Sequence, residues 1–408
     1  MKILITTELY LPTINGVVTS VVNLKTELIK LGHDVKILTL SNDSHSFKKD
    51  EVIYISSIGA GKIYPGARLS LIKENKYIQE LMNWHPDIIH TQSEFSTFFM
   101  AKHIANKLNI PIIHTYHTVY ENYTHYFSPV KSWGKVIVAQ FTRRILKQTE
   151  GVIAPSHKVQ TLLYNYDVKQ KIFVIPTGIN IPKLINDNND KLINLKHSLS
   201  IPNDKKVLLF VGRLAKEKNL EEIFNFYSKL DRTNLMLLIV GDGPNRVPLE
   251  SLAVNLSIDK EVRFTGMIAR ELINDYYRIG DVFISASNSE TQGLTYIEAL
   301  SNSIPIICRK DDCLDEVIVD GMNGWQYENF QQFQNQLDIT LGEQNKAYKQ
   351  NAFNSVMLRY SSSVFAKQIE AAYIQTIEYY LEKHHNVDLT TLGTNNIKVP
   401  ILTFSLNK

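Results

Sequence analysis

The chain has 408 residues, of which 44% are hydrophobic and 21% are charged, and its formal net charge is +3. This length exceeds what one ordinary core holds and the composition is globular, so the sequence predicts two domains and excludes a fibrous or intrinsically disordered chain. The two cysteines, Cys308 and Cys313, form neither a disulfide framework nor a zinc-binding set, which indicates a reducing cytoplasm.

The first half of the chain alternates short runs of β-branched residues with longer helical patterns. This alternation is typical of βαβ units around a parallel sheet. Strands are expected at 2–7, 34–40, 87–91, 110–116, 151–155 and 171–176, and helices at 17–32 and 95–108. A Pro-, Asn- and Asp-rich linker follows at 175–206. A second alternation then predicts strands at 207–212, 235–241, 261–266, 281–287 and 304–309.

The sequence therefore predicts an α/β protein with two Rossmann-like, parallel-sheet domains facing a cleft, which the carboxyl ends of the strands would line. We place the first domain at residues 1–176 and the second at residues 177–365. A long helical pattern follows at 362–384, and the tail at 386–408 is left unassigned.

Basic residues are concentrated in the first domain. Residues 1–178 carry 20 Lys and Arg against 13 Asp and Glu, a net charge of +7, whereas the remainder of the chain carries −4. This excess indicates an anionic partner, for example a membrane surface. The alternative is a solvated basic face without a partner, and charge alone favours that alternative.

The stretch SASNSETQGLTYIEAL, residues 285–300, holds two glutamates on either side of a glycine. In one continuous helix, Glu290 and Glu298 would lie roughly 12 Å apart along the axis, too far for a glycosidase pair. Gly293 instead predicts a strand, a loop and then a helix. The free N–H groups of Gly293, Leu294 and Thr295 would open that helix and favour an anion. Acids and amides in this order describe a sugar-nucleotide site; the alternative is a capped helix with a half-buried glutamate.

Other candidate residues also follow predicted strands. Arg213 and Lys218, in VGRLAKEKN, suit a diphosphate because Arg can bind two oxygens and Lys adds a point charge. Gly16, in LPTINGV, permits a close approach of the backbone to a ligand before the first helix. His117, in HTYHT, lies just beyond another strand.

Two motifs resemble a known family. G-R-x-x-x-x-K at 212–218 and E-x-x-x-x-x-x-x-E at 290–298 resemble the retaining glycosyltransferases of family four, which have the GT-B fold; the resemblance spans roughly residues 1–385. The segments INGVVTSVVNLKTEL, IIHTQSEFS, HTYHTVYENYTHY, IPTGI and SETQGLTYIEAL are similar to the bacterial 1,2-diacylglycerol 3-alpha-glucosyltransferases, or monoglucosyldiacylglycerol synthases. One departure is Asn15-Gly16, where many relatives have two glycines.

The resemblance implies roles for the matching residues of the donor site. Arg213 and Lys218 would neutralise the UDP leaving group, and the amides of Gly293, Leu294 and Thr295 would bind its phosphate. Glu290 would bind the hydroxyls of the donor sugar, and Glu298 would bind the ribose. Gly16 would contribute the glycine loop. His117 would lie beside the donor sugar as a catalytic positioner, and Glu94 would lie near the acceptor. The resemblance also implies that the first domain binds the acceptor, that the second binds the nucleotide sugar, and that a helix at 366–385 crosses back to the first.

The implied reaction is retaining transfer of a hexose, glucose from UDP-glucose in the first place, to diacylglycerol. The product would be a membrane glycolipid such as a lipoteichoic acid anchor. No cofactor is expected, and no metal, because no D-x-D motif is present. Galactose or N-acetylhexosamine donors stay open, as do a cell-wall polymer, teichoic acid or protein as acceptor.

Alternatives outside this enzyme class are disfavoured by missing motifs. A dinucleotide oxidoreductase lacks support because no G-x-G-x-x-G follows any strand. His114, His117 and His125 could be metal ligands, but no carboxylate cluster is spaced to complete a site. A noncatalytic sugar-nucleotide-binding protein would keep the same residues, so it stays open. No nucleic acid partner is expected.

Two basic segments could dock the enzyme on an anionic membrane. The segment 62–77 carries Arg68, Lys73 and Lys76, and the segment 130–148 carries Trp133, Arg143, Arg144 and Lys147. Drawn as a helix, the second segment groups Ile137, Val138, Phe141 and Ile145 on one side, the pattern of an interfacial helix. The alternative is that this apolar side packs into the domain core. Since the apolar runs are short and polar residues interrupt the N-terminal one, we expect a cytoplasmic protein, peripheral on the inner face of the plasma membrane.

Overall fold

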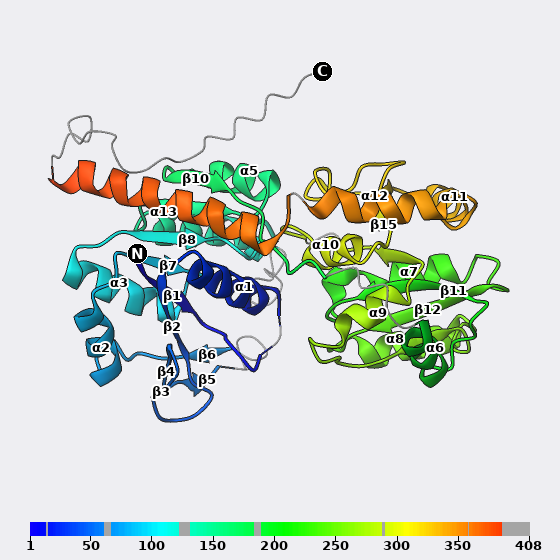
Figure 1. Ribbon diagram of the computed structural model, residues 1–408, viewed down its shortest axis with the longest axis horizontal. Coiled ribbons are helices and arrows are strands. Elements are labelled where there is room, and N and C mark those ends of the chain that lie inside the picture. The colour runs from blue at the N-terminus through cyan, green and yellow to red at the C-terminus, as the bar shows by residue number, and fades with distance from the viewer. Residues whose placement is uncertain are drawn as a thin grey trace, which may run out of the picture.

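The computed structural model of the chain is drawn in Figure 1. The residues that it describes are 1–13, 15–60, 67–121, 131–182, 189–287, 290–357 and 359–385. The tail at 386–408, His125 and the first part of the basic segment 62–77 lie outside the described residues.

The first domain is built on an eight-stranded sheet in the order β10-β9-β8-β7-β1-β2-β4-β3. Its strands are β1 (Lys2–Thr7), β2 (Asp34–Leu40), β3 (Phe47–Lys49), β4 (Val52–Ile55), β7 (Ile88–Thr91), β8 (Ile112–Thr115), β9 (Gly151–Ala154) and β10 (Lys171–Val174). Every neighbouring pair is parallel except β3 and β4. The expectation of a purely parallel sheet is therefore wrong at this edge, because only two residues join β3 to β4 and so short a connection requires antiparallel pairing. A separate antiparallel pair consists of β5 (Ile58–Gly59) and β6 (Arg68–Leu69).

The second domain is built on a parallel six-stranded sheet in the order β13-β12-β11-β14-β15-β16. Its strands are β11 (Lys206–Val211), β12 (Leu235–Val240), β13 (Val262–Phe264), β14 (Val282–Ser285), β15 (Ile306–Arg309) and β16 (Gly324–Tyr327). In chain order this is 3-2-1-4-5-6, the Rossmann order. The order reverses between β11 and β14, and ligands bind beyond the carboxyl ends of the strands at such a point.

Helices connect the strands and cover the sheets (Figure 1). In the first domain they are α1 (Gly16–Lys30), α2 (Lys76–Trp84), α3 (Ser96–Leu108), α4 (Lys131–Leu146) and α5 (His157–Asn165). In the second they are α6 (Asn189–Ser198), the 3-10 helix η2 (Lys216–Lys218), α7 (Leu220–Tyr227), α8 (Arg246–Asn255), α9 (Ile273–Arg278), α10 (Leu294–Ser301), α11 (Phe330–Leu341) and α12 (Asn345–Met357). The first helix shows how they form: Asn15 caps it by accepting from the Val18 amide, and Val21, Leu24 and Leu28 recur on one buried face.

The last helix, α13 (Ser362–His385), belongs to the core of the first domain. Its buried residues recur every three or four positions, so they form one stripe along the helix. They are Phe365, Ala366, Ile369, Ala372 and Tyr373, which share a core with Ile3, Ile5, Val21 and Leu24. Figure 1 shows α13 lying along the first domain after the chain has completed the second.

The chain passes between the domains at a tight crossing. The Ile179 amide donates to the Tyr360 carbonyl and the Ser362 amide donates to the Ile179 carbonyl, both at 2.8 Å. A Cβ atom on Gly178 would lie 2.6 Å from the Phe365 Cβ and 2.7 Å from the Ser361 carbonyl oxygen. These distances are shorter than van der Waals contact, so the crossing requires glycine at position 178.

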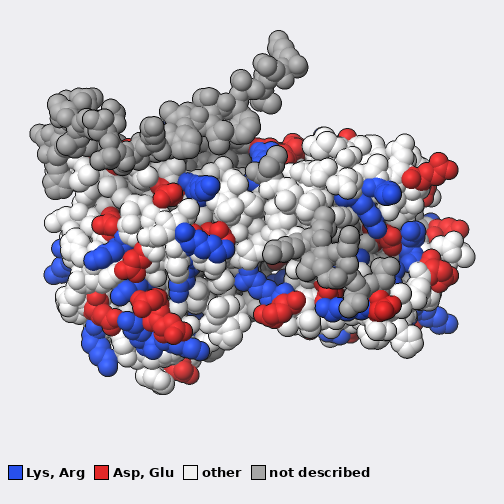
Figure 2. All heavy atoms as spheres, in the orientation of Figure 1, with Lys and Arg blue, Asp and Glu red and all other residues white. Residues whose placement is uncertain are grey.

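Figure 2 shows one face of the molecule with basic and acidic residues interspersed over both domains. On this face the basic residues of the first domain do not form a continuous positively charged patch. Among the described residues, no helix combines the length and the apolar character that crossing a bilayer requires.

The crossing yields a testable prediction. Gly178→Ala is expected to lower the free energy of unfolding by about 1–3 kcal/mol, because the added methyl group overpacks a site closed by backbone. Gly59→Ala is the matched control, since a Cβ atom there meets nothing within 4 Å. Denaturant unfolding followed by circular dichroism measures both variants, and equal midpoints for the two would contradict the tight crossing.

Candidate active site

The predicted donor-site residues lie beyond the carboxyl ends of β11 and β14, where the strand order of the second sheet reverses. Arg213 and Lys218 follow β11, and Glu290 follows β14. Lys218 lies in the 3-10 helix η2, and the Arg213 side chain is exposed. The topology thus brings together residues that are more than 70 positions apart in the sequence, as ligand sites in such sheets require.

An ion pair joins two of these residues. Lys218 Nζ lies 2.6 Å from Glu290 Oε1, and the two side chains are 24% and 11% exposed. Burial alone would raise the pKa of Glu290, but the charge and hydrogen bond of Lys218, together with Ser287 and Lys158, lower it below its ordinary value. Glu290 is therefore an ionised acceptor of hydrogen bonds at neutral pH, which suits it to bind hydroxyl groups.

The amino end of α10 lies beside the glycine loop of the first domain. Gly293 precedes α10 with a left-handed φ of 78°, and no side chain caps the helix. A Cβ atom on Gly293 would lie 2.8 Å from Leu314 Cδ2, and one on Gly16 would lie 3.3 Å from Leu294 Cδ1. Gly16 and Leu294 are the first residues of α1 and α10, so two helix amino ends, both favourable for an anion, meet here.

Glu298 lies one turn into α10. Its Oε2 atom accepts a hydrogen bond of 2.8 Å from the Tyr277 hydroxyl. Burial raises the pKa of Glu298, and the hydrogen bond from Tyr277 and the charge of Arg270 oppose that rise. Glu290 and Glu298 thus have different environments, which fits the different roles that the sequence predicts for them.

His117 lies beyond β8 and is half-buried. Its Nε2 atom is 2.6 Å from Gln92 Oε1. Desolvation lowers the pKa of His117 to about 4, with the nearby Glu94 raising it and His114 lowering it further. The ring is therefore neutral at physiological pH, so it can donate a hydrogen bond from one nitrogen and accept one at the other.

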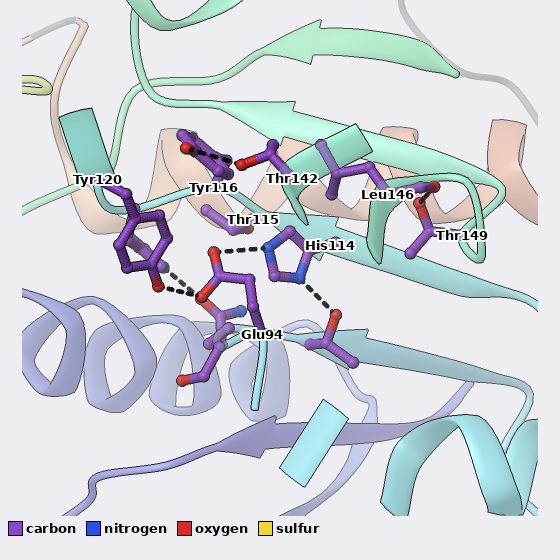
Figure 3. A network of polar contacts seen from close by, with 12 residues as sticks. Glu94, His114, Thr115, Tyr116, Tyr120, Thr142, Leu146 and Thr149 are labelled. Atoms are coloured by element: carbon purple, nitrogen blue, oxygen red, sulfur yellow. Dashed lines mark hydrogen bonds and ion pairs between the residues drawn. The ribbon is translucent and has the colours of Figure 1, made fainter. Parts of the chain in front are cut away.

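Glu94 is buried in a polar network at the carboxyl ends of β7 and β8 (Figure 3). One carboxylate oxygen lies 3.3 Å from His114 Nε2, and the other accepts a hydrogen bond of 2.5 Å from the Tyr120 hydroxyl. The second ring nitrogen of His114 lies 2.7 Å from Thr91 Oγ1. Glu94 therefore has a fixed orientation, and both of its oxygens already have a partner in the protein.

Glu8 is a residue of this region that sequence reasoning missed. It directly follows β1, and its Oε1 atom accepts from the Thr97 amide at 2.7 Å and the Thr97 hydroxyl at 3.0 Å. Its Oε2 atom is buried without a hydrogen-bond partner among the described residues. Burial raises the pKa of Glu8 to about 7, and Glu94 adds to the rise. The available signal was its position, an acid at the carboxyl end of a buried strand.

Lys158 is the second residue that sequence reasoning missed. From α5 of the first domain, its Nζ atom contacts Asp311 Oδ1 at 2.6 Å and the Glu290 carbonyl oxygen at 3.2 Å. The neighbouring Ser156 hydroxyl donates to the Thr291 carbonyl at 2.6 Å. These contacts hold the loop that carries Glu290 against the first domain. Lys158 lies between the predicted strands 151–155 and 171–176 with no motif around it, so no sequence signal marked it.

The basic residues predicted for membrane docking differ in their surroundings. Arg68 is folded back onto Ser57, with hydrogen bonds of 2.7 Å to its hydroxyl and 2.8 Å to its carbonyl, so it is not a freely presented charge. Lys73 and Lys76 are exposed on the surface.

The apolar side that the sequence assigns to 130–148 is divided in the structure. Val138 and Ile145 are buried in the core of the domain, whereas Ile137 is 51% exposed. That grouping is therefore wrong in part, because periodicity identifies an apolar stripe but not which of its edges faces the protein. The exposed face of α4 instead carries Trp133, Val136, Ile137, Arg143 and Arg144 at helical spacing, and Lys147, the first residue after the helix, extends it; these six residues are called the exposed face of α4 below.

The sequence disfavours His114, His117 and His125 as metal ligands. Among the described residues, which exclude His125, no group of three or more His, Cys, Asp or Glu side chains is arranged to hold a metal ion.

Two Rossmann-like sheets in tandem, the second parallel throughout and the first parallel except at its β3–β4 edge, give the chain the GT-B fold that solved glycosyltransferase structures share. Residues 14–182 match Glycosyltransferase Family 4, and residues 193–354 match Glycosyl transferases group 1. The chain belongs to glycosyltransferase family 4. The predicted fold and the predicted enzyme class, a hexosyltransferase, are thereby confirmed.

Curated relatives support this assignment over most of the chain. An alpha-monoglucosyldiacylglycerol synthase from Streptococcus pneumoniae is 38% identical over 332 residues, which cover 80% of this chain and 75% of the relative. An alpha-monoglucosyldiacylglycerol synthase from Acholeplasma laidlawii is 32% identical over 391 residues, which cover 93% of this chain and 98% of the relative.

Solved structures agree with the fold. HepE from Anabaena, in complex with UDP and glucose, has a TM-score of 0.72 at 17% identity, with 92% of this chain and 100% of that chain covered. Sucrose-phosphate synthase from Thermosynechococcus elongatus has a TM-score of 0.71 at 20% identity, with 92% and 99% covered. At these identities the likeness establishes the architecture alone.

The buried Glu8 carboxyl yields a prediction of pH dependence. Because its pKa is raised from 4.5 to about 7, its contribution to stability is complete below pH 4.5 and is lost as the pH rises through about 7. Glu8→Gln, which stays neutral, is expected to be more stable than the wild type at pH 8, by up to about 3 kcal/mol, and equally stable at pH 4.5.

Urea unfolding across this pH range measures the difference. Glu343→Gln, at an exposed glutamate of the second domain, is the matched control and should follow the wild type at every pH. A stability difference between Glu8→Gln and wild type that does not change with pH would show that Glu8 does not bind a proton in this range.

Proposed function

We propose that this chain transfers glucose from UDP-glucose to diacylglycerol with retention of configuration and without a metal ion. The observation that carries the proposal is the Lys218–Glu290 ion pair beside the amino end of α10, at the reversal point of the second sheet. The ion pair supplies a cation and an ionised acid, and the amino end of α10 supplies backbone amides. Together they suit one ligand that has both phosphates and hydroxyls.

The proposed substrates are supported by the names of related proteins. The relatives from Streptococcus pneumoniae and Acholeplasma laidlawii are alpha-monoglucosyldiacylglycerol synthases. A solved structure of HepE, which has the same fold, contains UDP-glucose. A glucosyl donor and a diacylglycerol acceptor are therefore the substrates to test first.

Charge placement explains how the second domain would promote transfer. Negative charge develops on the diphosphate as the bond to the anomeric carbon breaks, and fixed positive groups stabilise that charge in the transition state. Arg213, Lys218 and the amino end of α10 would supply these groups. Glu290 would orient the sugar through its hydroxyls, while Glu298, one turn further along, would bind the ribose.

The proton of the acceptor hydroxyl would go to a phosphate oxygen of the leaving group, on the same face as the attack. His117 is neutral and hydrogen-bonded through Nε2, so it suits a positioning role beside the donor sugar better than that of an obligatory base. With positive charge supplied by side chains and a helix, the reaction would not need a metal bridge to the diphosphate.

A diacylglycerol acceptor lies in a bilayer, so we propose that the first domain docks on an anionic membrane at the inner face of the plasma membrane. The exposed face of α4 supports this proposal. Trp133, Val136 and Ile137 form its apolar half, and Arg143, Arg144 and Lys147 form its basic half. Such a face can insert apolar groups at the interface while its cations contact anionic headgroups.

A transfer assay with diacylglycerol vesicles tests the reaction. Purified enzyme with UDP-glucose is expected to form α-linked glucosyldiacylglycerol in the presence of EDTA, as measured by mass spectrometry and by the anomeric coupling in proton NMR. Glu290→Ala should lower turnover by roughly 10²-fold or more if its bonds to the sugar strengthen in the transition state.

The controls separate the parts of this proposal. UDP-galactose and UDP-N-acetylglucosamine test the donor, and a teichoic acid polymer or a protein tests the acceptor. Activity that EDTA abolishes and magnesium restores would contradict the metal-free reaction. Consumption of UDP-glucose without formation of a glycosylated lipid would contradict the proposal that diacylglycerol is the acceptor.

Vesicle sedimentation tests the docking surface. Binding to phosphatidylglycerol vesicles should be strong at low salt and weak in ~0.5 M salt, where the Debye length is well below 8 Å. Arg143→Glu, Arg144→Glu and Lys147→Glu together should weaken it, since each basic residue near an anionic surface contributes on the order of 1 kcal/mol.

The affinity for UDP, measured by calorimetry, should be unchanged in the same variant. The matched control reverses Lys346 and Lys349, two lysines of α12 in the second domain. Equal binding to neutral and anionic vesicles would contradict the proposal that the exposed face of α4 docks on an anionic membrane. So would an equal loss of vesicle binding from the charge reversals at α4 and those at α12.

A further inference from the structure

A continuous chain of polar side chains links the last helix to His117. The Tyr373 hydroxyl, on α13, lies 2.7 Å from His90 Nδ1. The other ring nitrogen of His90, Nε2, lies 2.9 Å from Gln92 Nε2. Gln92 Oε1 lies 2.6 Å from His117 Nε2. Tyr373, His90 and Gln92 are buried, so water does not compete for these hydrogen bonds.

The amide of Gln92 gives this chain a direction. With the amide oriented as in the structure, its nitrogen donates to His90 Nε2, so that atom must accept through its single lone pair, which the Thr115 hydroxyl at 2.7 Å can share. The proton of the neutral His90 ring is therefore on Nδ1, from which it is donated to Tyr373. Burial lowers the pKa of His90 well below its ordinary value, which keeps the ring neutral.

The same reasoning fixes the proton on His117. Gln92 Oε1 can only accept, so His117 donates from Nε2 and its Nδ1 atom carries a lone pair. Among the described residues no hydrogen bond to His117 Nδ1 is formed. This nitrogen is thus able to accept a hydrogen bond from a substrate hydroxyl, whereas the other tautomer would present a donor.

The position of Tyr373 does not depend on this network. Its ring is fully buried in the first-domain core, together with Ile369 and Ala372 of the same helix, and it meets the His90 ring edge-on at a centroid distance of 5.4 Å. Packing of the helix therefore holds the hydroxyl in place, and the hydroxyl oxygen in turn accepts the hydrogen bond from His90 Nδ1.

We propose that the Tyr373 hydroxyl, acting through His90 and Gln92, sets the tautomer of His117 and so keeps Nδ1 ready to accept a hydrogen bond from the donor sugar. Tyr373, His90 and Gln92 are then positioning residues for transfer. The inference rests on the proposed role of His117 in the reaction, and it makes the last helix part of the active site.

Tyr373→Phe tests the relay because it removes the hydroxyl and keeps the ring. Without its acceptor, the Nδ1 proton of His90 is left unpaired in the core, which is costly. Moving that proton to Nε2 and turning the Gln92 amide restores the pairing. The amide nitrogen then faces His117 Nε2, which must accept, so the His117 proton moves to Nδ1.

Long-range proton–nitrogen NMR spectra of ¹⁵N-histidine-labelled enzyme report the tautomer, and the loss of one signal set in His117→Asn assigns the ring. We expect the Nε2–H tautomer in the wild type and the Nδ1–H tautomer in Tyr373→Phe. The kcat of Tyr373→Phe should fall about tenfold, the effect of one hydrogen bond, with the KM for UDP-glucose changed less than threefold. Tyr379→Phe, an exposed tyrosine of the same helix, is the matched control and should match the wild type in both measurements.

An Nδ1–H tautomer of His117 in the wild type would overturn the proposal without any variant. So would an unchanged tautomer in Tyr373→Phe, or a changed tautomer with an unchanged kcat. If the wild type transfers no glucose, the proposed function fails, and the NMR comparison still decides whether Tyr373 controls His117. Should Tyr373→Phe not fold, Gln92→Leu breaks the same chain next to His117 and is expected to remove the preference for one tautomer.

Discussion

The crossing of residues 178–179 with residues 360–362 is the constraint on which the rest of the molecule depends. Backbone hydrogen bonds in both directions join the two segments, and Gly178 leaves no space for a side chain between them. The chain enters the second domain and leaves it at this one place. Close by, the Gln292 side chain accepts from the Thr177 amide and donates to the Thr177 carbonyl, at 2.8 and 2.9 Å. The loop of the candidate donor site is therefore tied directly to the joint.

This arrangement explains why the candidate site needs both sheets. In each sheet the strand order reverses beside the first strand, between β1 and β7 and between β11 and β14. The loops beyond these points supply Glu8, Gln92 and Glu94 from one domain and Lys218 and Glu290 from the other. Their chemistry differs as well, because the first domain presents the neutral His117 ring and Glu8, whose pKa burial raises to about 7, whereas the second presents an ion pair. One side is suited to orienting hydroxyls, and the other to holding an anion.

Sequence reasoning predicted features that depend on local pattern. β1 and β2 have the predicted bounds because both are short runs rich in Ile, Leu, Val and Thr, and the residues after β11 and β14 could be identified because they follow apolar runs. It missed β16, whose sequence GWQY has no β-branched residue, and it misassigned half of the apolar stripe of α4. The contact of Tyr373 with His90 spans 283 positions and connects two residues that fit a core equally well without it. Only the fold brings such pairs together.

The burial of α13 in the first domain also governs the order in which the protein can fold during synthesis. The ribosome completes β1 to β10 early, yet Phe365, Ile369 and Tyr373, which fill one side of their core, are made only after the whole second domain. Amino-terminal domains ordinarily fold first as the chain emerges. Here the second domain, whose strands are contiguous between residues 206 and 327, can close its own sheet while the first still exposes apolar surface along α1. The nascent first domain is thus the part of this chain that a chaperone would have to protect, until the last helix arrives.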